Sequence, residues 1–135
     1  MKRPFECTWG LSQEEWDACR ERMTDVLRGV AASRATITYG EIADIVFGGR
    51  FSARSTALMQ MLEEVCRTQD AKRGIMLASI VVRKDTGIPG DGYFVVADDL
   101  GREVRIGDPA ERRRMWEREV TRVWDVMQAE EGYDS

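Results

Sequence analysis

The sequence predicts a single α/β (α+β) domain of the winged helix-turn-helix class, covering residues 1–135. Three observations lead to this prediction. Two helical patterns follow one another across a glycine-containing turn, which is the order of a helix-turn-helix. A β-branched run, a turn-rich segment and a second apolar run come next, and they predict a β-hairpin in the place of the wing. Finally, a chain of 135 residues is long enough to bury one hydrophobic core.

Capping boxes begin the first two predicted helices. The letters SQEE at 12–15 begin an extra N-terminal helix that should reach about Gly29, and TYGE at 38–41 begins a short helix over 39–47. In each box the hydroxyl accepts from a backbone N–H, and the glutamate three residues later bonds back to the cap. The glycine pair after residue 47 ends the second helix.

The third predicted helix is the recognition helix of the helix-turn-helix. Ser52 is expected to cap it, and the helix should run from Ala53 to about Thr68. Its apolar residues recur at helical spacing, so one face should point into the core.

The wing is predicted from the segments that follow. Residues 76–82 are largely apolar and β-branched, and residues 93–97 form a second apolar run. Residues 85–92 between them contain three glycines and a proline, which is the composition of a turn. We therefore expect an antiparallel hairpin with a long tip, and a winged-helix core over about 36–97.

A long C-terminal helix over about 109–128 completes the prediction. Asp108 is its N-cap and Pro109 its first residue. Tryptophans and methionines recur along it at helical spacing. For Trp16, Trp116 and Trp124 we expect core packing rather than a platform on which bases stack.

Composition excludes several classes of chemistry. The chain has no histidine, and its three cysteines include no Cys-x-x-Cys pair, so histidine-based catalysis and His-containing zinc sites are ruled out. We expect a non-enzymatic protein without metal or cofactor; a magnesium site built from Asp85 and Asp91 is the weakest alternative. No apolar run approaches the roughly 18 residues of a membrane span, and the first residues lack a signal-peptide core. A cytoplasmic protein that does not bind membranes is the expectation.

An ordered set of short motifs resembles a known family. TYGEIA occupies 38–43, Ala53-Arg54 follows, then come Val81-Val82-Arg83 and a glycine-rich turn that ends in Gly92-Tyr93. Over residues 36–93 this set is similar to the DNA-binding domain of the alkylguanine-DNA alkyltransferases and the non-catalytic alkyltransferase-like proteins.

The resemblance implies a winged helix whose recognition helix enters the minor groove. It also implies that Arg54 fills the base stack when a nucleotide is extruded, and that Tyr39 crowds the phosphate of that nucleotide. The chain departs from the family where its chemistry takes place, because Ala78 and Ser79 stand where the family has its methyl-accepting cysteine and its histidine. Alkyl transfer is therefore not expected.

Charge is distributed unevenly along the chain. The net charge is −4 over the whole sequence, but residues 50–84 hold seven basic and three acidic side chains, a local +4. Residues 85–135 hold seven basic and thirteen acidic ones, a local −6. A basic segment on an acidic body predicts weak, salt-dependent binding of nucleic acid. Arg112, Arg113 and Arg114 either extend the basic segment or balance nearby glutamates, and the second interpretation is favoured.

These observations predict a non-enzymatic protein that binds double-stranded DNA through helix 53–68. The rival hypothesis is a protein-interaction module that docks on a partner or a second copy through its C-terminal helix. An accessory protein of a mobile element or of a phage–host conflict system would fit this hypothesis. An enzyme with an unrecognised carboxylate site is a third alternative. The predicted DNA-contacting residues are Tyr39, Arg50, Ser52, Arg54, Ser55, Arg83 and Lys84.

Overall fold

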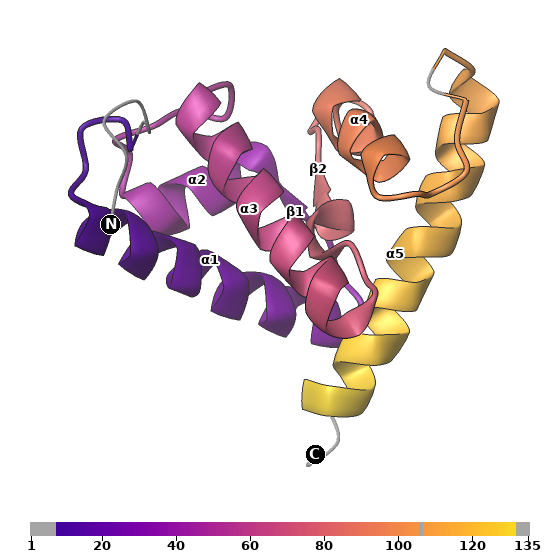
Figure 1. The fold of residues 1–135 in the computed structure, drawn as a ribbon, viewed down its shortest axis with the longest axis horizontal. Helices are drawn as coiled ribbons and strands as arrows, with labels where there is room; N and C mark the ends of the chain where they lie inside the picture. Colours follow the sequence, from indigo (N-terminus) through magenta and orange to yellow (C-terminus); the bar gives the residue numbers. More distant parts are fainter. Residues whose placement is uncertain (1–7, 106, 132–135) are drawn as a thin grey trace.

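Helices account for most of the computed structural model, which describes residues 8–105 and 107–131 (Figure 1). In chain order the first half contains α1 (Gln13–Ala32), β1 (Ile37–Thr38), α2 (Tyr39–Phe47) and α3 (Thr56–Arg73). The second half contains the short 3₁₀ helix η1 (Leu77–Ile80), β2 (Val81–Val82), α4 (Asp91–Asp99) and α5 (Pro109–Glu131). The two strands pair in parallel, with Ile37 opposite Val81 and Thr38 opposite Val82.

Both predicted capping boxes are present. Ser12 Oγ accepts from the Glu15 N–H at 3.0 Å, and the Glu15 carboxylate accepts from the Ser12 N–H at 2.8 Å. Thr38 and Glu41 repeat the arrangement at the start of α2, at 3.2 and 2.9 Å. These bonds satisfy backbone donors that a helix start otherwise leaves open. Helix α2 ends, as predicted, at Phe47, where Gly48 takes a left-handed conformation that costs a glycine little.

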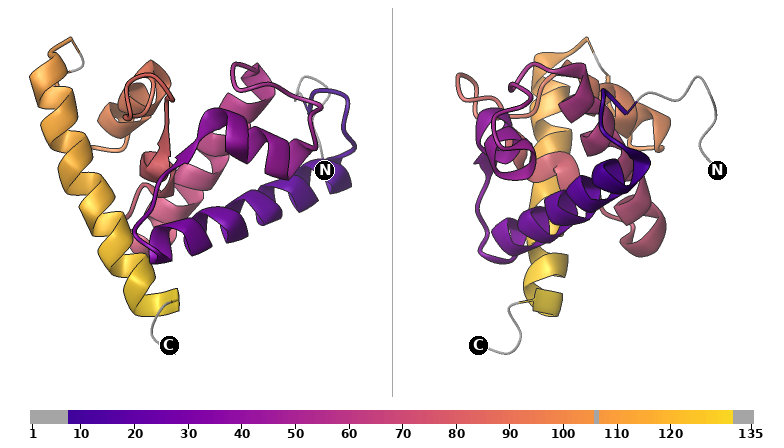
Figure 2. Two further views of the ribbon diagram at one scale, coloured as in Figure 1. Left: turned by 180° about the vertical axis from the view of Figure 1, so that it is seen from behind. Right: turned by 90° about the vertical axis from the view of Figure 1, so that its left-hand side faces the viewer.

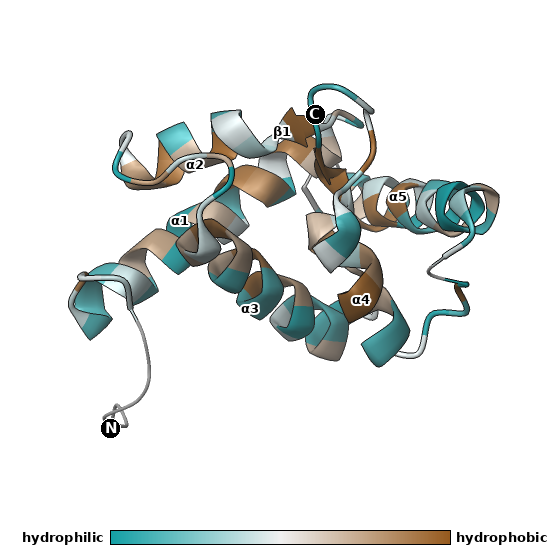
Figure 3. Ribbon diagram, turned by 90° about the horizontal axis from the view of Figure 1, so that it is seen from above, coloured by the Kyte–Doolittle hydropathy of each residue, from teal (hydrophilic) through white to brown (hydrophobic). Residues whose placement is uncertain are grey.

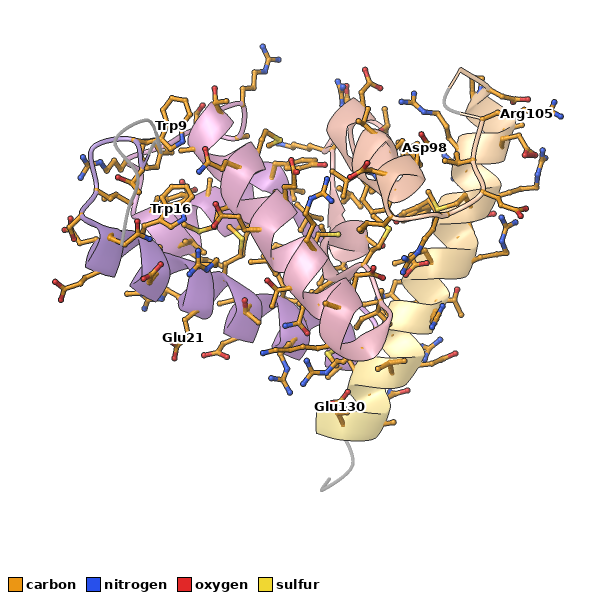
Figure 4. The ribbon with its side chains drawn as sticks, in the orientation of Figure 1. Trp9, Trp16, Glu21, Asp98, Arg105 and Glu130 are labelled. Atoms are coloured by element: carbon orange, nitrogen blue, oxygen red, sulfur yellow. The ribbon has the colours of Figure 1, made fainter. Side chains whose placement is uncertain are left out.

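The main core lies between α1, α3 and α5. Helix α1 contributes a fully buried stripe at helical spacing that includes Met23 and Leu27, and Trp16 points from α1 toward α3 in Figure 4. The short helix η1 packs against α1, α3 and α5, so its residues Leu77 and Ile80 are completely buried. Figure 2 shows α1 and α5 converging like the arms of a V, with η1 and the strands between them.

The predicted winged fold is wrong, because the wing does not form. Residues 76–82 make a 3₁₀ turn and a two-residue strand, and that strand pairs with β1 instead of with residues 93–97. Residues 93–97 belong to helix α4, in which Tyr93, Phe94 and Ala97 are buried. A short apolar run is compatible with either a strand or a buried helix, and the i, i+1, i+4 spacing of these three residues suits the helix. The protein is thus mainly helical, with a minimal parallel sheet in its described residues.

A second, smaller cluster holds α4 in place. Phe94 and Ala97 of α4 pack against Met76 and against Met115 of α5. Figure 3, seen from above, shows α3 and α4 side by side, with part of the α4 ribbon coloured as hydrophobic.

An ion network fastens the segment that links α4 to α5. The Arg102 guanidinium contacts the Asp70 carboxylate at 2.6 Å and the Glu119 carboxylate at 3.2 Å. Glu119 is 6% exposed and also accepts a hydrogen bond from the Met76 N–H at 3.0 Å. Burial lowers the pKa of Arg102, but the hydrogen bonds to Glu119 and Asp70 outweigh this effect and raise it, so the guanidinium stays charged.

The apolar stripe of α5 is used within the chain. Val123 and Met127 are fully buried, and the indole N–H groups of Trp116 and Trp124 donate to the backbone oxygens of Ser79 and Ala35 at 2.8 and 2.9 Å. The core packing expected for these tryptophans is therefore observed, although both stay partly exposed. A partner that docked on this stripe would have to displace α1 and η1. Among the helices of the described residues, none combines the length and apolarity needed to cross a membrane.

Candidate nucleic-acid interface

The basic segment of residues 50–84 is partly neutralised by ion pairs. Arg67 contacts the carboxylates of Glu63 and Asp99 at 2.9 and 2.7 Å. Two later arginines of the segment are also in ion pairs: Arg73 contacts the Glu130 carboxylate at 2.9 Å, and Arg83 contacts the Asp85 carboxylate at 2.9 Å. Within the described residues, the basic side chains of this segment without a carboxylate contact within 4 Å are Arg50, Arg54, Lys72 and Lys84.

These four cations do not gather at one place. Lys72 lies in the last turn of α3, about 24 Å along the helix axis from Thr56 at 1.5 Å per residue. Arg50 lies beside the turn before α1, where a Cβ added to Gly10 would be 3.0 Å from its Nη2 atom. Only Arg54 and Lys84 lie near the start of α2. The basic excess of residues 50–84 therefore does not form one continuous patch of unpaired cations.

Contacts between three segments bring Arg54, Arg83 and Tyr39 together. Gly40, the second residue of α2, lies against Ala53, the residue before Arg54: a Cβ added to Gly40 would be 3.9 Å from the Ala53 Cβ. The Tyr39 hydroxyl accepts a hydrogen bond from the Gly90 N–H at 3.0 Å, and the Arg83 side chain passes over Gly90. We call this region the Tyr39–Arg54 surface; its residues are Tyr39, Arg54, Ser55, Arg83 and Lys84.

Tyr39 has a structural task on this surface. Its hydrogen bond ties the first residue of α2 to the N-cap of α4. Burial raises the pKa of the phenol, which therefore stays protonated at neutral pH. The hydroxyl can still donate its own proton to a further acceptor such as a phosphate oxygen.

The recognition helix begins later than predicted. Ser55, not Ser52, is its N-cap, and the Ser55 hydroxyl accepts from the Leu58 N–H at 3.1 Å. Ser52 instead shapes the preceding turn, in which its hydroxyl accepts from the Arg54 N–H and its carbonyl from the Ser55 N–H. Arg54 is thus exposed in a loop one residue before the cap. Residues 48–55 form a longer connection than the three or four residues typical of a helix-turn-helix.

The first turn of α3 has no acidic side chain to offset the positive end of the helix dipole. Helices α1 and α2 carry glutamates in their first turns, whereas α3 carries no acidic residue there. The partial positive charge of this helix end is therefore not offset by a carboxylate of its own first turn. Lys84 adds positive charge nearby: hydrogen bonds from Thr38 lower the pKa of Glu41, and the lysine adds a smaller effect in the same direction.

A pocket of about 110 Å³ lies beside the Tyr39–Arg54 surface, between α3 and α4. Tyr39 belongs to both features, because its ring lines the pocket and its hydroxyl holds Gly90. The walls are mostly apolar, and Glu63 is the carboxylate among them. The lining residues are Tyr39, Met59, Leu62, Glu63, Cys66, Ala78, Val81, Gly92, Tyr93 and Val96.

The hydroxyl of Tyr93, a residue of the pocket wall, is already bonded within the chain. The Tyr93 hydroxyl lies 2.6 Å from the Ser79 hydroxyl, and both residues are buried. Burial strongly raises the pKa of Tyr93, so the phenol stays neutral. Their mutual hydrogen bond positions the Tyr93 ring as a flat wall of the pocket.

Cys66 is a pocket residue that sequence reasoning missed. It comes from α3 and lies next to Ala78, whose backbone hydrogen-bonds to its thiol. Burial raises the pKa of the Cys66 thiol to about 12, so it is not a ready nucleophile at neutral pH. Of the other two cysteines, Cys19 is half-buried and Cys7 lies outside the described residues. Helical spacing placed Cys66 inward, but nothing local indicated a cavity there.

Asp85 and Asp91, which flank the start of α4, are each paired with an arginine. Asp85 binds Arg83, and this hydrogen bond lowers the pKa of Asp85. Asp91 binds Arg112 at 2.9 Å, so the two aspartates of the hypothetical magnesium site face guanidinium groups. No cluster of three or more potential metal-binding side chains occurs in the part of the chain that the structure describes.

Comparison of the chain with protein-family models, with curated proteins and with solved structures found no match.

Proposed function

We propose that this protein binds double-stranded DNA without catalysing a reaction, and that it does so through the Tyr39–Arg54 surface. The observation that carries the proposal is the position of Arg54. This exposed cation lies directly before the N-terminus of α3, and its neighbour Ala53 lies against Gly40 in the first turn of α2, the turn that also approaches Lys84 through Glu41. Backbone phosphates are bound by such combinations of guanidinium, ammonium and helix N-terminus.

The number of cations limits the affinity. Arg54 and Lys84 can contact phosphates directly, and Arg83 can do so by sharing or leaving Asp85. Each phosphate contact contributes about −0.9 to the slope of log affinity against log salt. Three contacts therefore give a slope near −3, which means binding that is detectable at low salt and weak at physiological salt.

The test compares two pairs of charge deletions by fluorescence anisotropy with labelled duplex DNA. Arg54→Ala/Lys84→Ala removes two cations from the proposed surface; Lys72→Ala/Arg118→Ala removes two exposed cations elsewhere. We expect the first variant to lower the salt slope by about two, and the second to leave it close to wild type. Equal losses in both variants would show that only net charge matters, and no salt-dependent binding by the wild type would refute the proposal.

The pocket gives the proposal a second part, in which an extruded base enters between α3 and α4. The position of the pocket supports this part, because Tyr39 lines the pocket and also belongs to the Tyr39–Arg54 surface. Tyr93 and Met59 offer apolar contacts to a ring, and Glu63 can accept from the N–H groups of a base edge. A cavity of about 150 Å³ is known to admit benzene, so a partly open one of 110 Å³ suits part of a base ring.

Base extrusion is tested separately from DNA binding. DNA carrying the fluorescent adenine analogue aminopurine should brighten on binding, because the analogue leaves the base stack. Val96→Phe narrows the pocket from the α4 side, and we expect it to remove the increase in fluorescence while the anisotropy still reports binding. Saturated wild-type complexes without any such increase would contradict extrusion and leave DNA binding intact.

A further inference from the structure

Arg112 of α5 lies at the start of α4, next to the Tyr39–Arg54 surface. Its guanidinium carbon stands 4.6 Å from the centre of the Phe94 ring, and its Nη2 atom donates to the Asp91 carboxylate at 2.9 Å. The Arg112 side chain is 21% exposed, whereas the Asp91 side chain is 88% exposed. The cation is therefore held in place on an aromatic ring, and the anion that neutralises it is almost fully in solvent.

The surface and Arg112 are continuous through two adjacent residues. Gly90, the N-cap of α4, donates its N–H to Tyr39, and Asp91 is the next residue. The Arg83 side chain lies close to Gly90, and Asp91 makes a small contribution to raising the pKa of Arg83, after the larger effect of Asp85. The guanidinium group of Arg112 thus contacts Asp91 directly, while that of Arg83, which is paired with Asp85, lies near the adjacent Gly90.

We infer that the DNA-binding surface extends across the start of α4 to Arg112, and that a backbone phosphate takes the place of Asp91 on this guanidinium. This inference rests on the proposed function. Arg112 is suited to the exchange because its planar fork matches a phosphate as well as a carboxylate, and because Phe94 already orients it. Its buried Nε–H has no acceptor among the described residues, so the present arrangement is not fully bonded.

Asp91 then acts against DNA binding. Its ion pair with Arg112 is exposed on the aspartate side, and such pairs are weak, so a phosphate can compete for the guanidinium. Removing the carboxylate charge frees Arg112 and also removes a repulsion of the phosphate. We expect Asp91→Asn to tighten DNA binding about two- to five-fold at low salt, which is the range that an exposed ion pair supports.

The matched control is Asp98→Asn. Asp98 is an exposed aspartate at the other end of the same helix, and it is labelled in Figure 4. Both substitutions change the net charge by the same amount, so a general charge effect strengthens binding equally in both. A local effect strengthens it more in Asp91→Asn. Circular dichroism melting curves check that each variant is folded.

Arg112→Gln supplies the second half of the test, again by anisotropy with duplex DNA. We expect this variant to bind more weakly than the wild type and to abolish the gain from Asp91→Asn in the double variant, because the two residues act through one contact. Arg112→Lys keeps the charge and should retain part of the affinity; it also serves if the glutamine variant does not fold.

The outcomes separate the inference from the proposed function. If Asp91→Asn gains no more than Asp98→Asn, or keeps its gain beside Arg112→Gln, the inference is overturned. DNA binding that depends on Arg54 and Lys84 then still supports the proposed function. Absence of DNA binding by the wild type overturns both.

Discussion

Replacement of Glu119 probes the contact that holds α4 and the pocket against the rest of the molecule. Its carboxylate accepts from the Arg102 Nε–H at 3.2 Å, from the Arg102 Nη2–H at 3.3 Å and from the Met76 N–H at 3.0 Å. Glu119 is 6% exposed and Met76 is fully buried, so water cannot replace these bonds easily. Glu119→Ala removes all three at once.

The expected cost follows from the groups left behind. An unsatisfied buried N–H costs about 1–3 kcal/mol, and loss of one partner of a buried ion pair costs about 3–5 kcal/mol. These ranges describe overlapping effects and are not added. Asp70 keeps its 2.6 Å contact with Arg102, which puts the cost at the lower end. We expect Glu119→Ala to lower the free energy of unfolding by about 3–4 kcal/mol, and Glu119→Gln, which keeps an acceptor for Met76, by about 1–2 kcal/mol.

Urea denaturation followed by circular dichroism measures this loss. With a dependence of about 2 kcal/mol per molar urea, the midpoint of Glu119→Ala should fall by about 1.5–2 M. Glu117 is exposed on the same helix, so Glu117→Ala is the control and should change the free energy by no more than about 0.5 kcal/mol. A Glu119→Ala midpoint as close to wild type as that of the control would refute the reasoning.

Three further predictions concern the pocket and the start of α2. Tyr39→Phe removes the bond to Gly90 and should lower the free energy of unfolding by about 1 kcal/mol, with faster amide exchange at Gly90; unchanged exchange would contradict it. In a variant whose other cysteines are serine, Cys66, with a pKa of about 12, has roughly one thiolate in 10⁴ at pH 8, so a disulfide reagent should label it far more slowly than in urea. Thr38→Ala removes a helix cap worth about 1 kcal/mol by denaturation at pH 7. The Thr38 backbone N–H donates to the Glu41 carboxylate and, with the Thr38 hydroxyl, lowers the pKa of Glu41 below its usual 4.5. The stability that this carboxylate adds is therefore complete above pH 4.5 and disappears as the pH falls through the lowered pKa, so the stability difference between wild type and Glu41→Ala should shrink at low pH; a difference that does not shrink would argue against this origin.

Local signals predicted the helices with strong caps. Residues 39–47 form the predicted helix to the residue, because Thr38, Glu41 and Gly48 act within a few positions of one another. The same applies to the start of α1, where Ser12 and Glu15 form the expected box. Caps and turns are set by neighbouring atoms, so the sequence is sufficient for them.

The start of α3 shows where local signals compete. Ser52 and Ser55 are both suitable caps, and both hydroxyls do accept backbone N–H groups. The sequence alone favoured Ser52, whereas the folded chain uses Ser55. This shift moves Arg54 from the helix into the preceding loop, and so changes how the residue is presented to DNA.

The strand prediction failed because burial at residues 75–82 and 93–97 comes from long-range packing. Val81 and Val82 pair with residues more than forty positions earlier, and Phe94 packs against a helix that follows it. An apolar run carries no information about which partner will cover it. The site has the same limitation, because Cys66, Ala78 and Tyr93 meet only once α3, η1 and α4 have packed.

Taken by itself, the sequence determined which chemistry is missing, where the well-capped helices begin, and that the basic residues concentrate in 50–84. The net charge of that segment is a property of composition. Only the tertiary structure decided which of those charges are available, because carboxylates from α3, α5, the end of α4 and the loop after β2 neutralise Arg67, Arg73 and Arg83. Ion pairing depends on distances of a few ångströms between atoms far apart in the chain, and those distances exist only after folding.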